Sequence, residues 1–351
     1  MPEEKTRIGA GDRVLVTGAG GFIGSAVTRV LLERGARVVA ILEPQGSETN
    51  LAGLEIERVV ADINDADALR RAAAGARFVF HLAAIYRFWP DRPSRFYKVN
   101  VEGTRSVLSA ARAVGSERVV CTSTVATLGH NGTEPVDETS YARLEELVGS
   151  YERSKYVAEH EALREAAAGL PVVLVLPTTP FGPGDEAPTP TGRMVVDFLN
   201  GRMVGWVDTA LNVVDVDDVA LGHLLAAERG TVGRSYILGG ENLELRQIFE
   251  FLSVCTGLPA PKVKVPQWAT LPAAHLSEAL GGRLFGRDPT VTVSAARIAT
   301  SRRVFSDARA RRELGYESRS AAEALERSAR WYTEHGYVSP DRAAKIRWSR
   351  R

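Results

Sequence analysis

A cluster of glycines near the N-terminus restricts the possible folds of this 351-residue chain more than any other feature. The apolar residues 14–16 lead into Thr17-Gly18-Ala19-Gly20-Gly21-Phe22-Ile23-Gly24, and a helical pattern follows over residues 25–34. Gly18 permits a turn that a Cβ would block, Gly21 lets backbone N–H groups approach a pyrophosphate, and Gly24 allows close packing of helix and strand. A GxxGxxG string alone is also compatible with a chance turn, but here strand, turn, helix and second strand follow in order. We therefore expect a dinucleotide site whose phosphates contact Gly18, Gly21, Phe22, Ile23 and Gly24.

The second strand of this unit, residues 37–42, ends at Glu43. An acidic side chain at this place accepts hydrogen bonds from the adenosine ribose hydroxyls and repels a 2′-phosphate. No Arg or Lys follows before Arg58. The alternative is a solvated glutamate at a strand end. The sequence predicts NAD as cofactor and makes NADP the less favoured nucleotide.

Strand-like and helix-like segments alternate along the first half of the chain, which predicts an α/β, doubly wound (Rossmann) parallel sheet over residues 11–178. The further strands are expected at 56–60, 78–82, 118–122 and 172–176, and the helices at 65–74, 101–114 and 151–168. Residues 213–219 and 235–238 are apolar runs that can rejoin this sheet. A smaller substrate-binding lobe is expected over 179–212 and 239–340, with helices at 243–256 and 321–334. The basic residues 341–351 are expected to form a frayed, solvated tail.

The composition excludes several classes of function. The 44 basic and 43 acidic residues give a net charge of +1, so bulk charge does not indicate nucleic-acid binding. Cys121 and Cys255 have no CxxC or CxxH neighbourhood, which argues against a disulfide framework and a metal site. No apolar run reaches the roughly 18 residues that span a bilayer. We expect a cytoplasmic protein without an integral membrane span, acting on a small molecule.

The helix at 151–168 begins with Tyr151-Glu152-Arg153-Ser154-Lys155, and the i, i+4 spacing places Tyr151 and Lys155 on one face. A neighbouring ammonium favours a phenolate, so Lys155 is expected to lower the pKa of Tyr151 toward the range of a general acid/base. The strand 118–122 ends in hydroxyl residues, which include Ser123 and Thr124. Such a strand end is where open α/β sheets bind ligands. The alternative for the Tyr/Lys pair alone is an ordinary amphipathic face.

These motifs follow one another as in short-chain dehydrogenases/reductases of the extended type, and the resemblance covers nearly the whole chain. It includes Asp62, the stretch 81–84 (His-Leu-Ala-Ala), 99–104 (Val-Asn-Val-Glu-Gly-Thr) and 176–185. Within this superfamily the chain resembles the hopanoid-associated sugar epimerase group, which is similar to dihydroflavonol reductases. That likeness rests on the stretches 85–89, 188–193, 196–201 and 237–242. Two positions depart from the group's pattern: Glu43 stands where Arg is common, and Asp215 where His is usual.

The resemblance implies that Thr124, Tyr151, Lys155 and Asn100 form the catalytic set. It implies a homodimer, formed through the helices around 101–114 and 151–168. It also implies that Lys155 binds the nicotinamide ribose and that Asn100 supports a proton relay through water. Further cofactor contacts are expected from Asp62, Ile63, Leu82, Ala83, Ala84, Pro177, Thr178 and Thr179, together with Tyr151 and Lys155.

The reaction expected from this set is hydride transfer between NAD and a carbinol carbon. Either a dehydrogenase/reductase or a nucleotide-sugar epimerase with retained NAD fits, while a 4,6-dehydratase fits poorly because Val125-Ala126 follow Thr124 where Asp-Glu is usual. A catalytically silent NAD-binding sensor or scaffold is the alternative of another class, although such proteins commonly lose the Tyr/Lys pair.

A bulky, partly apolar substrate is favoured by aromatic residues that are equally compatible with a core role: Tyr86, Phe88, Trp89, Phe181, Phe198 and Trp206. A sugar site needs several hydrogen-bonding side chains, for which Arg193, Asn200 and Asn212 are candidates. The expected substrate contacts are Tyr86, Ser123, Thr124, Arg193, Phe198 and Asn212.

Overall fold

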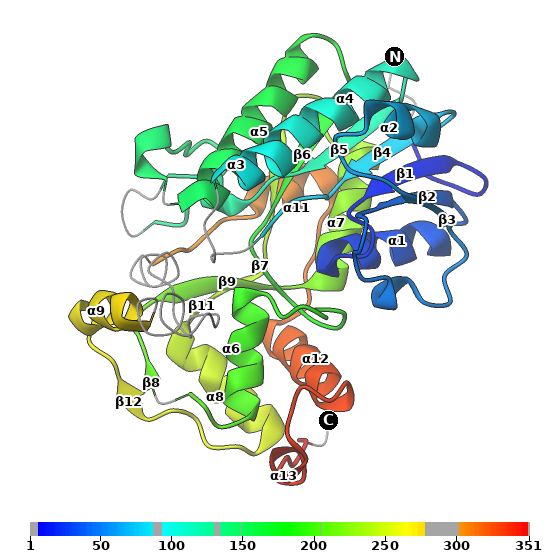
Figure 1. Ribbon diagram of the computed structural model, residues 1–351. Coiled ribbons are helices and arrows are strands. Elements are labelled where there is room, and N and C mark those ends of the chain that lie inside the picture. The colour runs from blue at the N-terminus through cyan, green and yellow to red at the C-terminus, as the bar shows by residue number, and fades with distance from the viewer. Residues whose placement is uncertain are drawn as a thin grey trace.

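The first part of the chain forms a seven-stranded parallel sheet (Figure 1). The structure is a computed structural model, and it describes residues 6–86, 93–129, 134–147, 149–203, 205–277 and 302–349. The strands lie in the order β10-β6-β5-β4-β1-β2-β3, so the order reverses beside β1, as in a Rossmann fold. Their bounds are β1 Arg13–Thr17, β2 Arg37–Leu42, β3 Glu57–Val60, β4 Phe78–His81, β5 Arg118–Thr122, β6 Val172–Pro177 and β10 Ser235–Leu238. The predicted fold class is confirmed.

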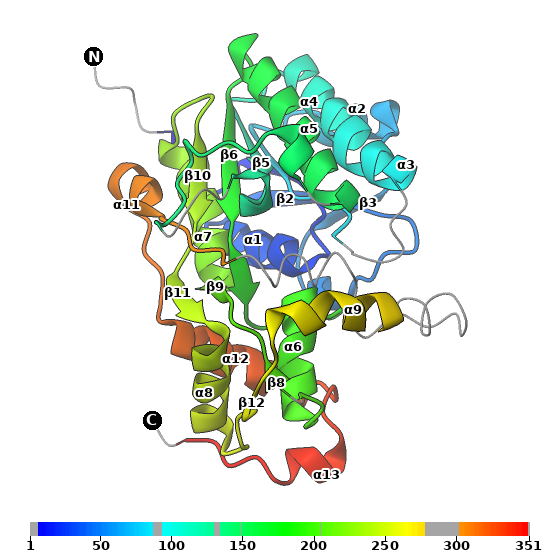
Figure 2. The ribbon, with the colours of Figure 1, turned by 90° about the vertical axis from the view of Figure 1, so that its left-hand side faces the viewer.

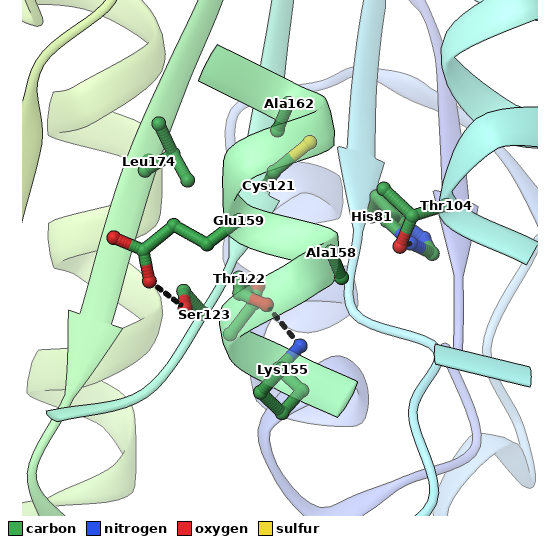
Figure 3. Close-up of a pocket in the computed structure, with 10 residues that line it drawn as sticks. All are labelled: His81, Thr104, Cys121, Thr122, Ser123, Lys155, Ala158, Glu159, Ala162 and Leu174. Carbon is green, nitrogen blue, oxygen red and sulfur yellow. Dashed lines mark hydrogen bonds between the residues drawn. The ribbon is translucent and has the colours of Figure 1, made fainter. Parts of the chain in front are cut away.

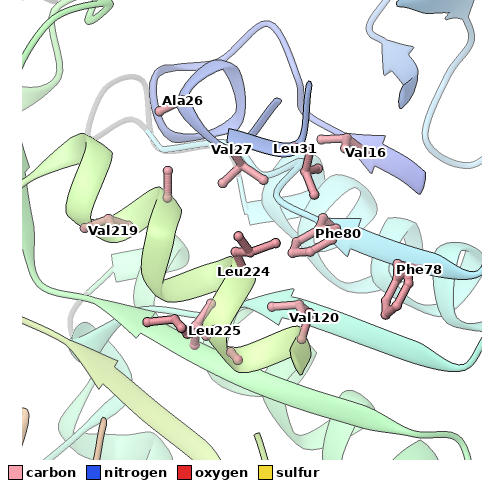
Figure 4. Packing of buried hydrophobic residues seen from close by; sticks show 14 of the residues in the cluster. Val16, Ala26, Val27, Leu31, Phe78, Phe80, Val120, Val219, Leu224 and Leu225 are labelled. Carbon is pink, nitrogen blue, oxygen red and sulfur yellow. The ribbon is translucent and has the colours of Figure 1, made fainter. Parts of the chain in front are cut away.

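Helices cover both faces of this sheet, because neighbouring residues of each strand point to opposite sides. Val16 packs with α1 (Phe22–Glu33) and α7 (Val216–Arg229) in one buried cluster, which Figure 4 shows. Leu15 packs in a second cluster on the other face, where α4 (Gly103–Ala113) and α5 (Gly149–Ala167) lie. The remaining helices of this part are α2 Ala66–Ala73, α3 Pro93–Phe96 and α11 Ala308–Leu314, with short turns η1 Thr49–Leu51, η3 Val125–Thr127 and η4 Leu144–Glu146.

A smaller lobe lies below the main sheet in Figures 1 and 2 and has its own core. Its sheet has the order β11-β9-β7. The elements are β7 Thr179–Phe181, β9 Ala210–Asp215, β11 Glu241–Glu244, α6 Pro190–Leu199, α8 Leu245–Thr256 and α12 Ala321–Glu334. The outer elements are β8 Gly205–Trp206, β12 Val263–Lys264, α9 Gln267–Ser277 and α13 Pro340–Ala343. Within the described ranges, no helix combines the length and the apolar character that crossing a bilayer requires.

The return of the chain to the main sheet differs from the expectation in one segment. Residues 235–238 form β10, which pairs with β6 in parallel. Residues 213–219, however, are divided between β9 and α7. The Asp215 side chain accepts a hydrogen bond from the Asp217 N–H and begins α7 at this point, as an N-cap residue does. This segment therefore contributes a helix over α1 rather than a strand of the main sheet.

The basic C-terminal segment is not frayed as far as residue 349. The Arg347 N–H donates to the Thr256 carbonyl at 2.7 Å, and the Ser349 N–H donates to the Cys255 carbonyl at 3.0 Å. Ile346 is buried, and the Arg330 guanidinium lies 4.3 Å from the centre of the Trp348 ring. The segment therefore packs against α8 and α12.

Candidate active site

The glycine-rich turn has the geometry that the sequence predicts. Gly18 has a φ of +74°, and a Cβ there would lie 2.7 Å from the Ala83 nitrogen. A Cβ on Gly24 would collide with the Gly18 carbonyl oxygen. Gly21 precedes α1, and among the described residues no side chain caps this helix, so its first N–H groups, at Phe22 and Ile23, are left for an anion to bind. A turn without room for side chains at Gly18 and Gly24, followed by an uncapped helix N-terminus, fits the pyrophosphate of a dinucleotide.

The expected adenosine end lies beside the ends of β2 and β3. The Glu43 side chain is 74% exposed directly after β2, so it is accessible to a ribose. The Asp62 carboxylate accepts hydrogen bonds from the Asn64 N–H at 2.8 Å and the Asn64 Nδ2 at 3.1 Å, and these bonds lower the pKa of Asp62. Ile63 packs against Gly103, where a Cβ would lie 2.8 Å from an Ile63 methyl carbon.

Sequence reasoning missed a cation at this end of the site. The Arg95 guanidinium on α3 lies 4.0 Å from the Glu43 carboxylate. Arg95 is 52 positions after Glu43 in the sequence, on the short helix α3. A search for basic residues directly after Glu43 therefore does not find it. Both side chains therefore lie beside the end of β2, where the adenosine ribose with its 2′-hydroxyl or 2′-phosphate is expected.

The expected nicotinamide end gathers the ends of β4 and β6. Leu82, Ala83 and Ala84 follow β4, where the Leu82 N–H donates to the Thr17 carbonyl at 3.1 Å. Pro177 ends β6, and the Thr178 N–H donates to the Leu238 carbonyl at 3.2 Å. Thr179 begins β7. These backbone contacts hold the predicted cofactor residues at the C-terminal edge of one sheet.

Tyr151 lies in the first turn of α5, and the Thr124 hydroxyl lies close enough to its side chain to influence its pKa. Thr124 begins η3 just beyond β5 and also accepts the Ala126 N–H at 3.2 Å. The Tyr86 ring lies 4.9 Å from the Tyr151 ring at an interplanar angle of 54°. Burial raises the pKa of Tyr151 to about 12, and the neighbouring Thr124 hydroxyl acts in the opposite direction. The expected lowering of this pKa by Lys155 is not seen, because burial is the largest influence on the phenol.

Lys155 is buried one turn further along α5, and its Nζ donates to the Thr122 carbonyl at 2.7 Å. Burial lowers the pKa of Lys155 to about 8. The side chain borders a cavity of about 10 Å³, which is close to the space that one buried water needs (Figure 3). The cavity is lined by His81, Thr104, Cys121, Thr122, Ser123, Lys155, Ala158, Glu159, Ala162 and Leu174.

Asn100 lies in a π-helical segment, η2 (Tyr97–Glu102), a local widening that is often found at functional sites. Its Oδ1 accepts the Ile85 N–H at 2.8 Å, and its Nδ2 donates to the Ser154 hydroxyl at 2.9 Å. Ser154 in turn donates to the Tyr151 carbonyl at 2.8 Å. Asn100 is 1% exposed, and its side-chain hydrogen bonds link the segment after β4 to α5.

His81 is a second buried support that the sequence did not reveal. The Thr104 hydroxyl donates to the Asn100 carbonyl at 2.6 Å, so it accepts from His81 Nε2 at 2.8 Å. His81 Nδ1 then accepts from the Thr17 hydroxyl at 2.8 Å. Burial lowers the pKa of His81 to about 3, which keeps the ring neutral. Threonines spaced around a histidine are the only sequence signal, and they are not specific.

The expected substrate residues do not all reach one surface. Tyr86 is 41% exposed beside Tyr151, and Arg193 is exposed on α6. Phe198 is corrected to a core residue, because it is 3% exposed and stacks on Phe249 with ring centres 5.9 Å apart. Ser123 is buried, and its hydroxyl donates to Glu159 at 2.5 Å, away from any substrate.

Two asparagines that were candidates for a sugar site hold the lobe together. Asn212 Nδ2 donates to Asn242 Oδ1 at 2.8 Å, and its Oδ1 accepts the Gly240 N–H at 2.8 Å. Asn200 Nδ2 donates to the Tyr337 carbonyl at 3.0 Å. Phe181 is a core residue, and Trp206 packs against the lobe core. Phe88 and Trp89 lie outside the described residues.

Asp215, the second departure from the group's pattern, is fully buried. Its carboxylate pairs with the Arg327 guanidinium of α12 at 2.6 Å and caps α7. The carboxylate therefore joins α7 to the smaller lobe.

Cys121 and Cys255 are both free and buried. In the described parts of the chain, no group of three or more His, Cys, Asp or Glu side chains is placed so that it could hold a metal ion.

Comparison with known proteins agrees with this fold. The NAD dependent epimerase/dehydratase family model matches residues 14–239. A putative dihydroflavonol 4-reductase of Synechocystis is 42% identical over 336 residues, covering 94% of this chain and 97% of that protein. Sterol demethylase protein B of Methylococcus capsulatus is 34% identical, covering 92% and 99%.

A solved structure has the same fold throughout. The nucleoside-diphosphate-sugar epimerase PA4631 from Pseudomonas aeruginosa is 28% identical, with a TM-score of 0.78 over 94% of this chain and 100% of that chain. Together with the family match and the 42% identical relative, this similarity covers both the sheet and the smaller lobe. The chain belongs to the NAD-dependent epimerase/dehydratase family, within the extended short-chain dehydrogenases/reductases.

Proposed function

We propose that the protein is an NAD-dependent oxidoreductase that interconverts a secondary alcohol and a ketone on a bulky, partly apolar molecule, with Tyr151 as general acid/base. The observation that carries this proposal is the proximity of the Thr124 hydroxyl to the Tyr151 side chain at the C-terminal edge of the sheet. Two hydroxyls held together there converge on one oxygen of a substrate, as proton transfer requires. Lys155, the third member, is buried one turn away.

The division of labour follows from the surroundings of each group. Bound nicotinamide supplies or accepts the hydride. Burial raises the pKa of Tyr151 to about 12, so its phenol is protonated at neutral pH and can donate a proton to a carbonyl oxygen. Thr124 would orient that oxygen. Lys155 would hold the ribose hydroxyls, and its positive charge would favour the phenolate that forms.

The character of the surroundings supports a reductase or dehydrogenase over an epimerase. Asn200 and Asn212 are used in structural hydrogen bonds, which leaves Arg193 as the exposed member of the three expected sugar contacts. Beside Tyr151 lies the Tyr86 ring, a surface suited to a ring-containing substrate. The names of the two relatives refer to a dihydroflavonol and to a sterol, which are bulky and largely apolar molecules.

A nucleotide-sugar epimerase with retained NAD is the second candidate. The similarity to the Pseudomonas aeruginosa epimerase over the whole chain favours it, because the same Tyr, Lys and Thr set serves both reactions. An epimerase keeps its oxidised intermediate and returns the hydride, so its nucleotide is regenerated within each turnover.

For the cofactor we propose NAD in preference to NADP, on the exposed Glu43 carboxylate at the end of β2. Charge repulsion between this carboxylate and a 2′-phosphate supports the choice. Arg95, only 4.0 Å away, would be the partner for a 2′-phosphate if Glu43 were removed.

We also propose a homodimer formed through α4 and α5. The two helices are joined to each other by Arg105–Glu161 and Arg112–Glu165 ion pairs.

The test begins with the purified protein before any cofactor is added. Denaturation followed by mass spectrometry and absorbance identifies any nucleotide that it carries. We expect a site that exchanges added NADH reversibly and reduces flavanone, steroid or terpenoid ketones, with Tyr151→Phe inactive on the same panel. Stoichiometric retained NAD, together with inversion of UDP-sugars, would support the epimerase. NAD binding without turnover of either panel would reject both enzymatic assignments.

A further inference from the structure

A buried carboxylate lies directly behind the proposed catalytic hydroxyls. Glu159 is on α5, one turn after Lys155, and is 3% exposed. Its Oε2 accepts from the Ser123 hydroxyl at 2.5 Å and from the Thr127 hydroxyl at 2.9 Å (Figure 3 shows the first of these). Its Oε1 is buried without a hydrogen-bond partner among the described residues. Carboxylates are rarely buried without a compensating role, so this arrangement requires an explanation.

The two hydroxyls that Glu159 accepts are on either side of Thr124. Ser123 precedes Thr124 directly, and its N–H donates to the Val175 carbonyl of β6 at 2.8 Å. Thr127 follows three residues later, and its single hydroxyl proton is shared between Glu159 and the Thr124 carbonyl, whose oxygen lies 2.8 Å from the Thr127 hydroxyl. The backbone of Thr124 is therefore fixed on both sides by groups that meet at one carboxylate oxygen.

Glu159 is also part of the same buried region as Lys155. Both side chains line the small cavity between α5 and β5, which is shown in Figure 3. The same helix thus carries Tyr151, Lys155 and Glu159 at successive i+4 positions. Any shift of α5 relative to the end of β5 would alter the Thr124–Tyr151 contact, and the Glu159 hydrogen bonds oppose such a shift.

We propose that Glu159 is a positioning residue of the active site, which holds Thr124 against Tyr151 by accepting hydrogen bonds from Ser123 and Thr127. The inference rests on the proposed function, in which Thr124 and Tyr151 share a substrate oxygen. Glu159 does not touch substrate or nucleotide. The effect on Thr124 depends on the side-chain oxygen of Glu159 as a hydrogen-bond acceptor, not on the negative charge of Glu159.

Three variants separate this role from general stability. Glu159→Gln keeps an oxygen that accepts from both hydroxyls, Glu159→Ala removes it, and Thr127→Val removes one donor with little change of volume. Glu161→Gln is the matched control, because Glu161 is on the same helix and pairs with Arg105 and Arg164 on the surface. Each variant is assayed for kcat and KM on the best ketone and for the Kd of NADH, and its crystal structure is determined.

We expect Glu159→Ala to lower kcat about 10- to 100-fold, because a misplacement of about 1 Å costs that much. Glu159→Gln should stay within about threefold of the parent, Thr127→Val should fall between the two, and the Kd of NADH should stay within about twofold throughout. Glu161→Gln should match the parent. The Thr124 hydroxyl should move away from the Tyr151 side chain in the Glu159→Ala crystal structure and stay beside it in that of Glu159→Gln.

An unchanged kcat in Glu159→Ala would overturn the proposal. Equal losses of kcat in Glu159→Gln and Glu159→Ala would also overturn it, as would an unaltered Thr124–Tyr151 contact in the crystal structure of Glu159→Ala. If Glu159→Ala does not fold, Thr127→Val decides by the same measurements. If the parent reduces no ketone and inverts no sugar, the proposed function fails, whereas the crystal structures still decide the role of Glu159.

Discussion

The Thr124 hydroxyl lies beside the Tyr151 side chain, between the end of β5 and the start of α5, and lowers the pKa that burial raises. The two residues are 27 positions apart in the sequence, and their meeting depends on the parallel pairing that brings β5 between β4 and β6. The contact gives a substrate oxygen two hydroxyl partners at once. The predictions below follow from this contact and its surroundings.

Tyr151→Phe should lower kcat at least about 10²-fold while leaving the Kd of NADH within about threefold of the parent, because only the proton-transferring oxygen is removed. Tyr156→Phe on the same helix is the matched control and should retain full activity. Steady-state kinetics and fluorescence titration with NADH measure the two effects. Turnover by Tyr151→Phe close to that of the parent would assign the acid/base role elsewhere.

Glu43→Arg should narrow or reverse the preference for NAD over NADP, because it replaces a repulsive charge with one that pairs with a 2′-phosphate. Arg95, 4.0 Å from Glu43, would add a second cation there. Calorimetric titration with both nucleotides measures the ratio of the two Kd values. Glu33→Arg makes the same charge change at the far end of α1 and should leave the ratio unchanged. Equal affinities for NAD and NADP in the parent would show that Glu43 has no such role.

Acid should destabilise the protein through its buried histidines. Burial lowers the pKa of His81 to about 3 and that of His223 to about 4, against about 6.5 in an unfolded chain. The unfolded chain therefore binds protons that the folded chain does not. This contribution to stability is complete above about pH 6.5 and is lost as the pH falls toward 4 and 3.

Buried carboxylates act in the opposite direction, since burial raises the pKa of Glu159, Asp185 and Asp215. A variant therefore isolates the histidine contribution. From pH 7 to pH 5, His223→Gln should lose about 2 kcal/mol less unfolding free energy than the parent. Urea unfolding at each pH measures the difference. The same pH dependence in both proteins would show that His223 is not buried in its neutral form.

Phe198→Ala should lower the unfolding free energy by about 3–5 kcal/mol, because it leaves a cavity beside Phe249 in the core of the smaller lobe. Arg193→Ala, on the exposed face of the same helix, should change it by less than about 0.5 kcal/mol. Thermal and urea unfolding give both values. A Phe198→Ala protein as stable as the parent, with a raised KM for substrate, would restore the sequence-based assignment of Phe198 to the substrate site.

Local patterns were sufficient to predict most of the architecture. The glycine turn, the alternation of strands and helices, and the i, i+4 pair of Tyr151 and Lys155 each depend on residues close in the sequence. The sheet order, the added strand β10 and the family follow from the same patterns.

The features that sequence reasoning missed depend on contacts between distant segments. Whether Ser123 faces substrate or the core is decided by Glu159, 36 residues away. An aromatic residue such as Phe198 is equally expected in a substrate pocket and in a core, so the sequence alone does not show that Phe198 packs on Phe249. The pKa of Tyr151 depends on its burial, which no motif encodes. Asp215 and Arg95 acquire their roles from Arg327 and Glu43, each on another element.

The most direct test of the central claim follows the hydride. The protein is incubated with NADH carrying deuterium on the transferable face of C4, together with flavanone, steroid and terpenoid ketones or with UDP-sugars, and the products are analysed by mass spectrometry. The account predicts an alcohol with one deuterium on the carbinol carbon and one equivalent of NAD formed, with neither product in Tyr151→Phe. Inversion of a UDP-sugar with no net oxidation of NADH, and no labelled alcohol from any ketone, would contradict it.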